Sequence, residues 1–250
     1  MVEFQRKDFY SYEDFLEIMR LLRAPGGCPW DREQTHSSIR RNFLEETYEV
    51  LDAIDHDDAH GMCEELGDVL MQVAFHAQIE AERGRFTMAD VVNGVAQKLV
   101  YRHPHVFGDV QADTSQQVLN NWEVLKRREK GQRSTADAVE SVPHTLPALW
   151  RAEKIQSKTA KAGFDWTSSL QALDKLEEEV RELRAALEAG QAPDAPHGVR
   201  EELGDTLFMA AKVAQMSGLD PEDALHGACD KFDRRFRAVE EAADKPLSEC

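Results

Sequence analysis

Apolar residues recur along most of the chain with the spacing of α-helices. Positions three and four residues apart share one face of a helix, and long stretches of the chain follow that period. No segment shows the sustained alternation of apolar and polar residues that is typical of a strand. The pattern predicts an all-α protein with helices at Tyr12 to Leu22, Ser37 to Ile54, Gly61 to Arg83, Met88 to Arg102, Gln116 to Glu129, Leu149 to Ala162, Ser168 to Ala189, Val199 to Met216 and Pro221 to Ala243.

A short acidic sequence motif occurs twice in the chain. The letters Glu-Glu-Leu-Gly-Asp at residues 64–68 reappear unchanged at residues 201–205. Upstream, Glu-x-x-Glu at residues 46–49 is echoed at residues 179–182, and downstream Lys-x-x-x-Arg at residues 98–102 is echoed at residues 231–235. Three matches in the same order indicate that the chain contains two copies of one module.

The segment between the two copies differs in composition from both. It is rich in Ser, Thr, Gly and Pro and carries no sustained apolar period. We therefore expect a tandem repeat of two helical-bundle modules, at residues 1–130 and 148–250, joined by a linker at residues 131–147.

The repeated acids fall where helix geometry brings them close together. Residues three apart share one side of a helix, which applies to Glu46 with Glu49 and to Glu65 with Asp68. For the first pair, a solvent-exposed acidic face is an equally good interpretation. The second helix differs, because apolar residues between Leu66 and Ile79 occupy nearly its whole circumference and predict burial on all sides.

Crowded carboxylates require a neutralising charge. Two of them about 4 Å apart repel by roughly 4 kcal/mol at an effective dielectric constant near 20. Oxygen ligands without His or Cys suit Mg²⁺ or Mn²⁺, whereas a di-iron bundle requires Glu-x-x-His on two helices, and the sequence contains that spacing only once, at residues 33–36. The pattern therefore favours a magnesium site, with Mn²⁺ as the alternative ion, and a phosphorylated substrate.

Basic and aromatic residues follow the acids in the repeat. Lys98 with Arg102 could clamp phosphate oxygens, although a basic helix face that offsets the acidic surplus fits equally well. Trp122 and Lys126 could stack on a base and contact phosphate, but core packing explains the tryptophan at least as well.

Composition excludes several functional classes. The chain has 30 basic and 47 acidic residues, and its net charge of −17 disfavours binding to a nucleic-acid polymer. No stretch approaches the roughly 18 apolar residues of a membrane span. Neither a P-loop nor a Gly-x-Ser-x-Gly elbow occurs, and the four cysteines lack zinc or disulfide spacing. We expect a cytoplasmic protein without a membrane partner.

Glu-x-x-Glu followed by Glu-x-x-Asp, present in both copies, resembles the signature of the MazG nucleoside triphosphate pyrophosphohydrolases. Three flanking motifs are similar to those of two-domain bacterial MazG. They are Gly-Cys-Pro-Trp-Asp at residues 27–31, Arg-His-Pro-His-Val-Phe at residues 102–107 and Gly-Phe-Asp-Trp at residues 163–166. The resemblance covers nearly the whole chain.

The resemblance implies an all-α nucleoside triphosphate pyrophosphatase fold and a homodimer. It also implies Mg²⁺-dependent hydrolysis of NTPs and dNTPs, by attack of water on the α-phosphorus, to the monophosphate and pyrophosphate. By position it assigns metal binding to Glu179, Glu182, Glu202, Asp205, Glu46, Glu49, Glu65 and Asp68. Substrate binding falls to Lys231, Arg235, Lys98, Arg102, Trp122 and Lys126, and orienting or deprotonating the attacking water to Glu178 and Glu45.

Two alternatives stay open, namely removal of pyrophosphate from phosphoribosyl-ATP and a scaffold that binds nucleotide without turnover. In two-domain relatives the second module ends with a helix that carries a tryptophan and a lysine, whereas this sequence stops at Cys250 before such a helix. We therefore expect the second site to bind nucleotide less completely, although the C-terminal module is commonly the active one in the family.

Overall fold

The fold is known from a computed structural model that describes residues 4–129, 131–190 and 192–243. These residues form twelve helices and no strand. The chain divides into two compact units, the first at Met1–Trp122 and the second at Glu123–Cys250. The prediction of an all-α chain with two modules is confirmed. None of the described helices is long and apolar enough to cross a membrane.

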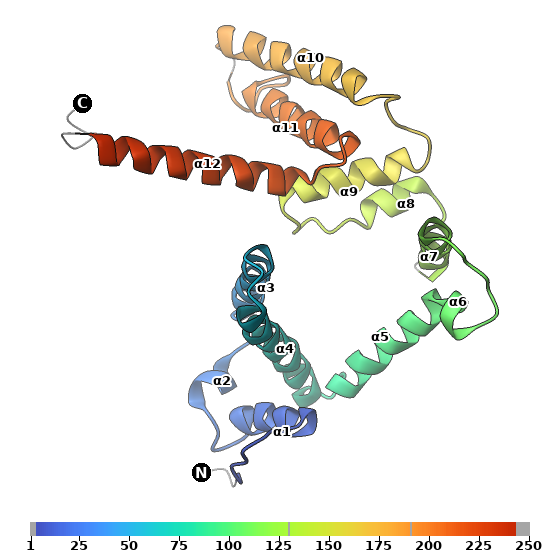
Figure 1. The fold of residues 1–250 in the computed structure, drawn as a ribbon, viewed down its shortest axis with the longest axis vertical. Helices are drawn as coiled ribbons and strands as arrows, with labels where there is room; N and C mark the ends of the chain where they lie inside the picture. The colour runs from blue at the N-terminus through green and yellow to red at the C-terminus, as the bar shows by residue number, and fades with distance from the viewer. Residues whose placement is uncertain (1–3, 130, 191, 244–250) are drawn as a thin grey trace. The chain divides into compact units, whose positions relative to one another are not determined.

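Each unit contains its own set of helices, labelled in Figure 1. The first unit holds α1 (Tyr12–Arg23), α2 (Pro29–Glu33), α3 (Arg40–Asp55), α4 (Ala59–Glu82), α5 (Met88–Arg102) and α6 (Pro104–Phe107). Helix α7 (Ser115–Glu129) spans the boundary, and the second unit continues with α8 (Thr135–Glu140), α9 (Ala148–Ala160), α10 (Ser169–Glu188), α11 (Val199–Met216) and α12 (Pro221–Ala242).

Side-chain caps fix where several helices begin. At α1 the hydroxyl of Ser11 accepts the backbone N–H of Asp14, while the Asp14 carboxylate accepts the backbone N–H of Ser11. The same reciprocal capping box starts α5 and α8. Each cap stabilises its helix by about 1 kcal/mol, because it satisfies backbone donors that the first turn leaves free.

Matching glycines end the long acidic helices α4 and α11. Gly84 and Gly218 have φ of 65° and 72°, in the left-handed region that favours glycine. After α4, the N–H of Gly84 donates to Ala81 and the N–H of Arg85 donates to Glu80. This is a Schellman motif, and the same two bonds close α11. The two units therefore repeat in geometry as well as in sequence.

In the repeat, α3 of the first unit corresponds to α10 of the second, and α4 corresponds to α11. Within each unit the two acidic helices pack side by side (Figure 1). Only three residues connect α3 to α4, whereas residues 189–198 separate α10 from α11. A short connection between packed helices makes them antiparallel. In both units, carboxylates from the two helices come within 4.8 Å of one another.

All nine predicted helices are present, with ends that agree to within a few residues. The short helices α2, α6 and α8 were not predicted. Helix α8 lies inside the segment expected to be a linker, where Ala138 and Val142 are buried. The expected module boundaries stay a prediction, and three of their limits, residues 1, 130 and 250, lie outside the described residues.

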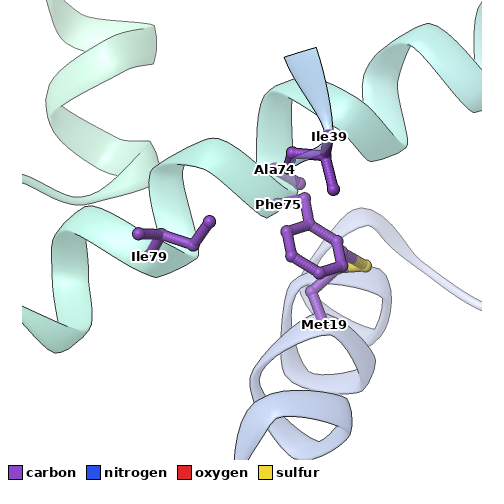
Figure 2. Close-up of a cluster of buried hydrophobic side chains, with 5 residues drawn as sticks. All are labelled: Met19, Ile39, Ala74, Phe75 and Ile79. Carbon is purple, nitrogen blue, oxygen red and sulfur yellow. The ribbon is translucent and has the colours of Figure 1, made fainter. Parts of the chain in front are cut away.

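A small apolar core holds α1 against α4. Its buried members are Met19, Ile39, Ala74, Phe75 and Ile79. Figure 2 shows the Phe75 ring of α4 facing Met19 of α1. The guanidinium of Arg23 lies 5.3 Å from the centre of that ring and pairs with Glu82 at 2.8 Å. This core fixes the C-terminal half of α4.

The expectation that α4 is buried on all sides is wrong for its N-terminal half. Leu66 and Leu70 are 51% and 39% exposed, whereas Ala77 is buried. At the matching positions of α11, Leu203 and Leu207 are also exposed. The apolar core with α1 covers only the C-terminal half of α4, so the apolar side chains near the acids remain exposed to solvent in the single chain.

Candidate functional site

The first acidic cluster lies between α3 and α4. Glu46 and Glu49 of α3 and Glu65 of α4 each bring a carboxylate oxygen to within 4.8 Å of the other two. Asp68 follows Glu65 on α4 after one turn and lies close enough for its charge to raise the pKa of Glu46. The antiparallel helix pair thus gathers acids that the sequence places three residues apart.

Burial and like charge both act on the first acidic cluster. Burial, followed by the charges of Asp68 and Glu49, raises the pKa of Glu46 above its ordinary value. Burial and the charge of Glu49 likewise raise the pKa of Glu65. One carboxylate oxygen of Glu65 is enclosed without a hydrogen-bond partner. Among the described residues, no lysine or arginine pairs with the cluster, and Arg41 pairs with the neighbouring Glu45 instead.

The second acidic cluster repeats this arrangement between α10 and α11. Glu179, Glu202 and Asp205 each bring a carboxylate oxygen to within 4.8 Å of the others. Glu179 and Glu202 are 7% and 5% exposed. Desolvation and then the charge of Glu179 raise the pKa of Glu182, which lies one turn further along α10. Both copies of the sequence motif therefore produce a compact group of carboxylates.

The two clusters differ in their countercharges. The Nζ atom of Lys175 lies 2.8 Å from Glu179 and 2.6 Å from Glu178. The Nδ1 atom of His197 lies 3.6 Å from Glu202. Sequence reasoning missed Lys175, although its position four residues before Glu179 is the usual spacing of an ion pair on a helix.

The two acids predicted to act on water lie beside the clusters rather than within them. Glu45 is exposed and pairs with Arg41 at 2.7 Å. Glu178 is also exposed, and its hydrogen bond from Lys175 lowers its pKa below the ordinary value. A lowered pKa makes Glu178 a weaker acceptor of protons.

The predicted phosphate-binding residues come from other helices. Lys98 and Arg102 lie on α5, and Lys231 and Arg235 lie on α12. In Figure 1 each of these helices diverges from the acidic pair of its own unit. No ion pair joins Lys98 or Lys231 to an acidic cluster in the described part of the chain. The single chain therefore does not bring these lysines to the acids, and their role stays a prediction.

Two predicted nucleotide-binding residues do lie together. The guanidinium of Arg102 sits 5.4 Å from the centre of the Trp122 ring, as a cation–π pair. Lys126 follows Trp122 on α7 after one helical turn. The tryptophan is half-buried, so part of its surface remains accessible.

Comparison with known proteins finds the same duplication. Residues 34–107 and 167–239 each match the family model of the MazG nucleotide pyrophosphohydrolase domain. The nucleoside triphosphate pyrophosphohydrolase of Escherichia coli (strain K12) is 47% identical over 226 residues, which cover 90% of this chain and 85% of the relative. The nucleoside triphosphate pyrophosphohydrolase/pyrophosphatase MazG of Thermotoga maritima is 43% identical over 234 residues, which cover 94% of this chain and 87% of the relative. The similarity extends over both units, and each matched segment contains one acidic cluster.

Proposed function

Because this chain belongs to the MazG nucleotide pyrophosphohydrolase family, we propose that it hydrolyses nucleoside triphosphates to monophosphates and pyrophosphate at divalent-cation sites formed by its acidic clusters. The observation that carries the proposal is the first acidic cluster, in which three carboxylates meet without a basic partner among the described residues. The repeat of that arrangement in the second unit supports it.

The donor atoms fit magnesium or manganese. All are carboxylate oxygens, and the enclosed oxygen of Glu65 has no other partner. When bound, the cation neutralises phosphate oxygens and makes a nearby water more acidic. The residues proposed to hold it are Glu46, Glu49, Glu65 and Asp68 in the first unit and Glu179, Glu182, Glu202 and Asp205 in the second.

The remaining residues would position the reactants. Water attacks the α-phosphorus, the bond to the bridging oxygen breaks, and pyrophosphate leaves, while the water's proton passes to a nearby acceptor. Glu178 is held as a carboxylate by Lys175, so we assign to it the orientation of the water rather than acceptance of its proton. Lys98 with Arg102, and Lys231 with Arg235, are proposed to stabilise charge on the phosphates.

We also infer that the protein is a homodimer. Helices α3, α4 and α5 of the first unit and helices α11 and α12 of the second unit expose large apolar residues. A second copy that packs on these faces would remove them from water. The residues concerned are Leu44, Leu51, Leu66, Leu70, Val92, Val95, Leu99, Leu203, Leu207, Leu225, Phe232, Phe236 and Val239.

Charged substitutions on these faces test the dimer. We expect the unmodified protein to have the mass of a dimer by light scattering, and Leu70→Glu with Leu207→Glu to convert it to a monomer, because a buried charge opposes association. Phe9→Glu, at an exposed residue before α1, is the control and should leave the dimer intact. A monomeric unmodified protein would contradict this inference.

The proposed reaction is tested by measuring pyrophosphate release from a panel of NTPs and dNTPs, with Mg²⁺ or with a chelator. We expect release only with the cation. Phosphoribosyl-ATP at equal concentration should be the poorer substrate, and a faster reaction with it would favour that alternative. Calorimetry that detects nucleotide binding while no pyrophosphate forms would favour the scaffold. A cytoplasmic location stays a prediction.

A further inference from the structure

Lys175 distinguishes two acidic clusters that otherwise repeat each other. Its ammonium group bridges Glu178 and Glu179, at 2.6 and 2.8 Å. The side chain of Glu179 is 9% exposed, and that of Lys175 is 34% exposed, so the contact is partly shielded from water. Lys175 donates a hydrogen bond to each of these carboxylates, and the two bonds raise its pKa above its ordinary value. Lys175 therefore places an ammonium group 2.8 Å from Glu179 of the second acidic cluster.

The first acidic cluster has no such charge at the matching position. When Glu46 is aligned with Glu179, and Glu49 with Glu182, Lys175 falls on Asn42. Asn42 is neutral. The adjacent Arg41 has a side chain that is 86% exposed and turns outward to Glu45. Among the described residues, the carboxylates of the first cluster thus lie within 4.8 Å of one another without a lysine or arginine beside them.

A resident ammonium changes how a cluster responds to metal. A divalent cation that binds Glu179 must displace Lys175 from that carboxylate or tolerate its repulsion at a few ångströms. At the first cluster the cation instead relieves repulsion that no lysine or arginine offsets within the described part of the chain. We propose that Lys175 is a resident counter-ion of the second acidic cluster, so that the first cluster takes up divalent cations at a lower concentration than the second.

The proposal rests on the proposed metal sites and adds a regulatory consequence to them. When divalent cation is scarce, only the first unit would be loaded, and the second would follow as the concentration rises. His197 adds a weaker countercharge to Glu202, because its side chain is 83% exposed and it is charged only when protonated. The order in which the two clusters take up divalent cation therefore depends chiefly on residues 42 and 175.

A reciprocal exchange tests this directly. Mn²⁺ is titrated into the full chain without nucleotide, and free Mn²⁺ is followed by electron paramagnetic resonance. We expect two classes of site in the unmodified protein. Lys175→Asn should tighten the weaker class by roughly tenfold, and Asn42→Lys should weaken the tighter class by a similar factor. Glu65→Gln assigns the tighter class to the first cluster by removing it.

Controls separate the local effect from general charge and from unfolding. Lys154→Asn removes an exposed lysine of α9 in the same unit and should leave both classes unchanged. Circular dichroism verifies that each variant is folded. If the unmodified protein binds no Mn²⁺, the proposed metal sites themselves fail. If Mn²⁺ binds but the two classes are equal, or neither exchange shifts its class, the counter-ion proposal is overturned while the proposed function stands.

Discussion

Replacing Glu65 and Glu202 together by glutamine should lower the rate of pyrophosphate release about a hundredfold or more. Each substitution keeps the size of the side chain but removes one carboxylate charge from an acidic cluster. Loss of preorganised charge around a reacting phosphate typically costs factors of this order. Either single variant should abolish only the share of activity that belongs to its own unit. The measurement is the initial rate with saturating nucleotide and Mg²⁺.

The control uses the residue that precedes each of these acids. Glu64→Gln with Glu201→Gln makes the same chemical change in the same repeated motif, but both side chains are exposed and neither belongs to an acidic cluster. This variant should retain most of the activity. A doubly substituted Glu65 and Glu202 protein that turned over at the normal rate would remove the acidic clusters from the mechanism.

Replacing Asp165 by alanine should destabilise the second unit by about 3 kcal/mol. The side chain of Lys212 is 1% exposed, pairs with Asp165, and donates to Gln215 at 2.6 Å. Removal of Asp165 leaves this ammonium buried without its countercharge, which typically costs 3–5 kcal/mol. The lower value applies because Asp165 is itself 27% exposed, so water can reach the vacated position.

A matched pair of variants separates the ion pair from packing. Lys212→Met removes the charge but keeps an unbranched apolar side chain beside Trp166, so we expect little change in stability. Adding Lys212→Met to Asp165→Ala should recover most of the lost free energy of unfolding, measured with urea. Losses that simply add would show that Asp165 stabilises the fold in some other way.

The helical fold could be predicted because the signals for it are local. The apolar period runs through every long helix, and residues such as Ser11 and Gly84 mark where helices begin and end. Helices α2, α6 and α8 are too short to show a period, so they were missed. Burial was harder to predict, because the apolar residues around Leu66 indicate a covered helix but not which surface covers it.

The acidic clusters could also be predicted, since helix geometry and duplication together place their members. The countercharge of the second cluster, Lys175, could not be predicted. Arg41 precedes Glu45 by four residues, and Lys175 precedes Glu179 by four, yet the first pair is exposed and the second lies inside a cluster. Spacing along a helix identifies residues that can pair, but the direction of the side chain depends on packing that the sequence pattern does not contain.

Hydrolysis in ¹⁸O-labelled water tests the central claim most directly. The unmodified protein is given a nucleoside triphosphate with Mg²⁺ or with a chelator, and the products are analysed by mass spectrometry. We predict equal amounts of monophosphate and pyrophosphate, with one ¹⁸O in the monophosphate and none in the pyrophosphate, and no reaction with the chelator. Label in the pyrophosphate, or equal turnover without a divalent cation, would contradict cation-dependent attack of water on the α-phosphorus.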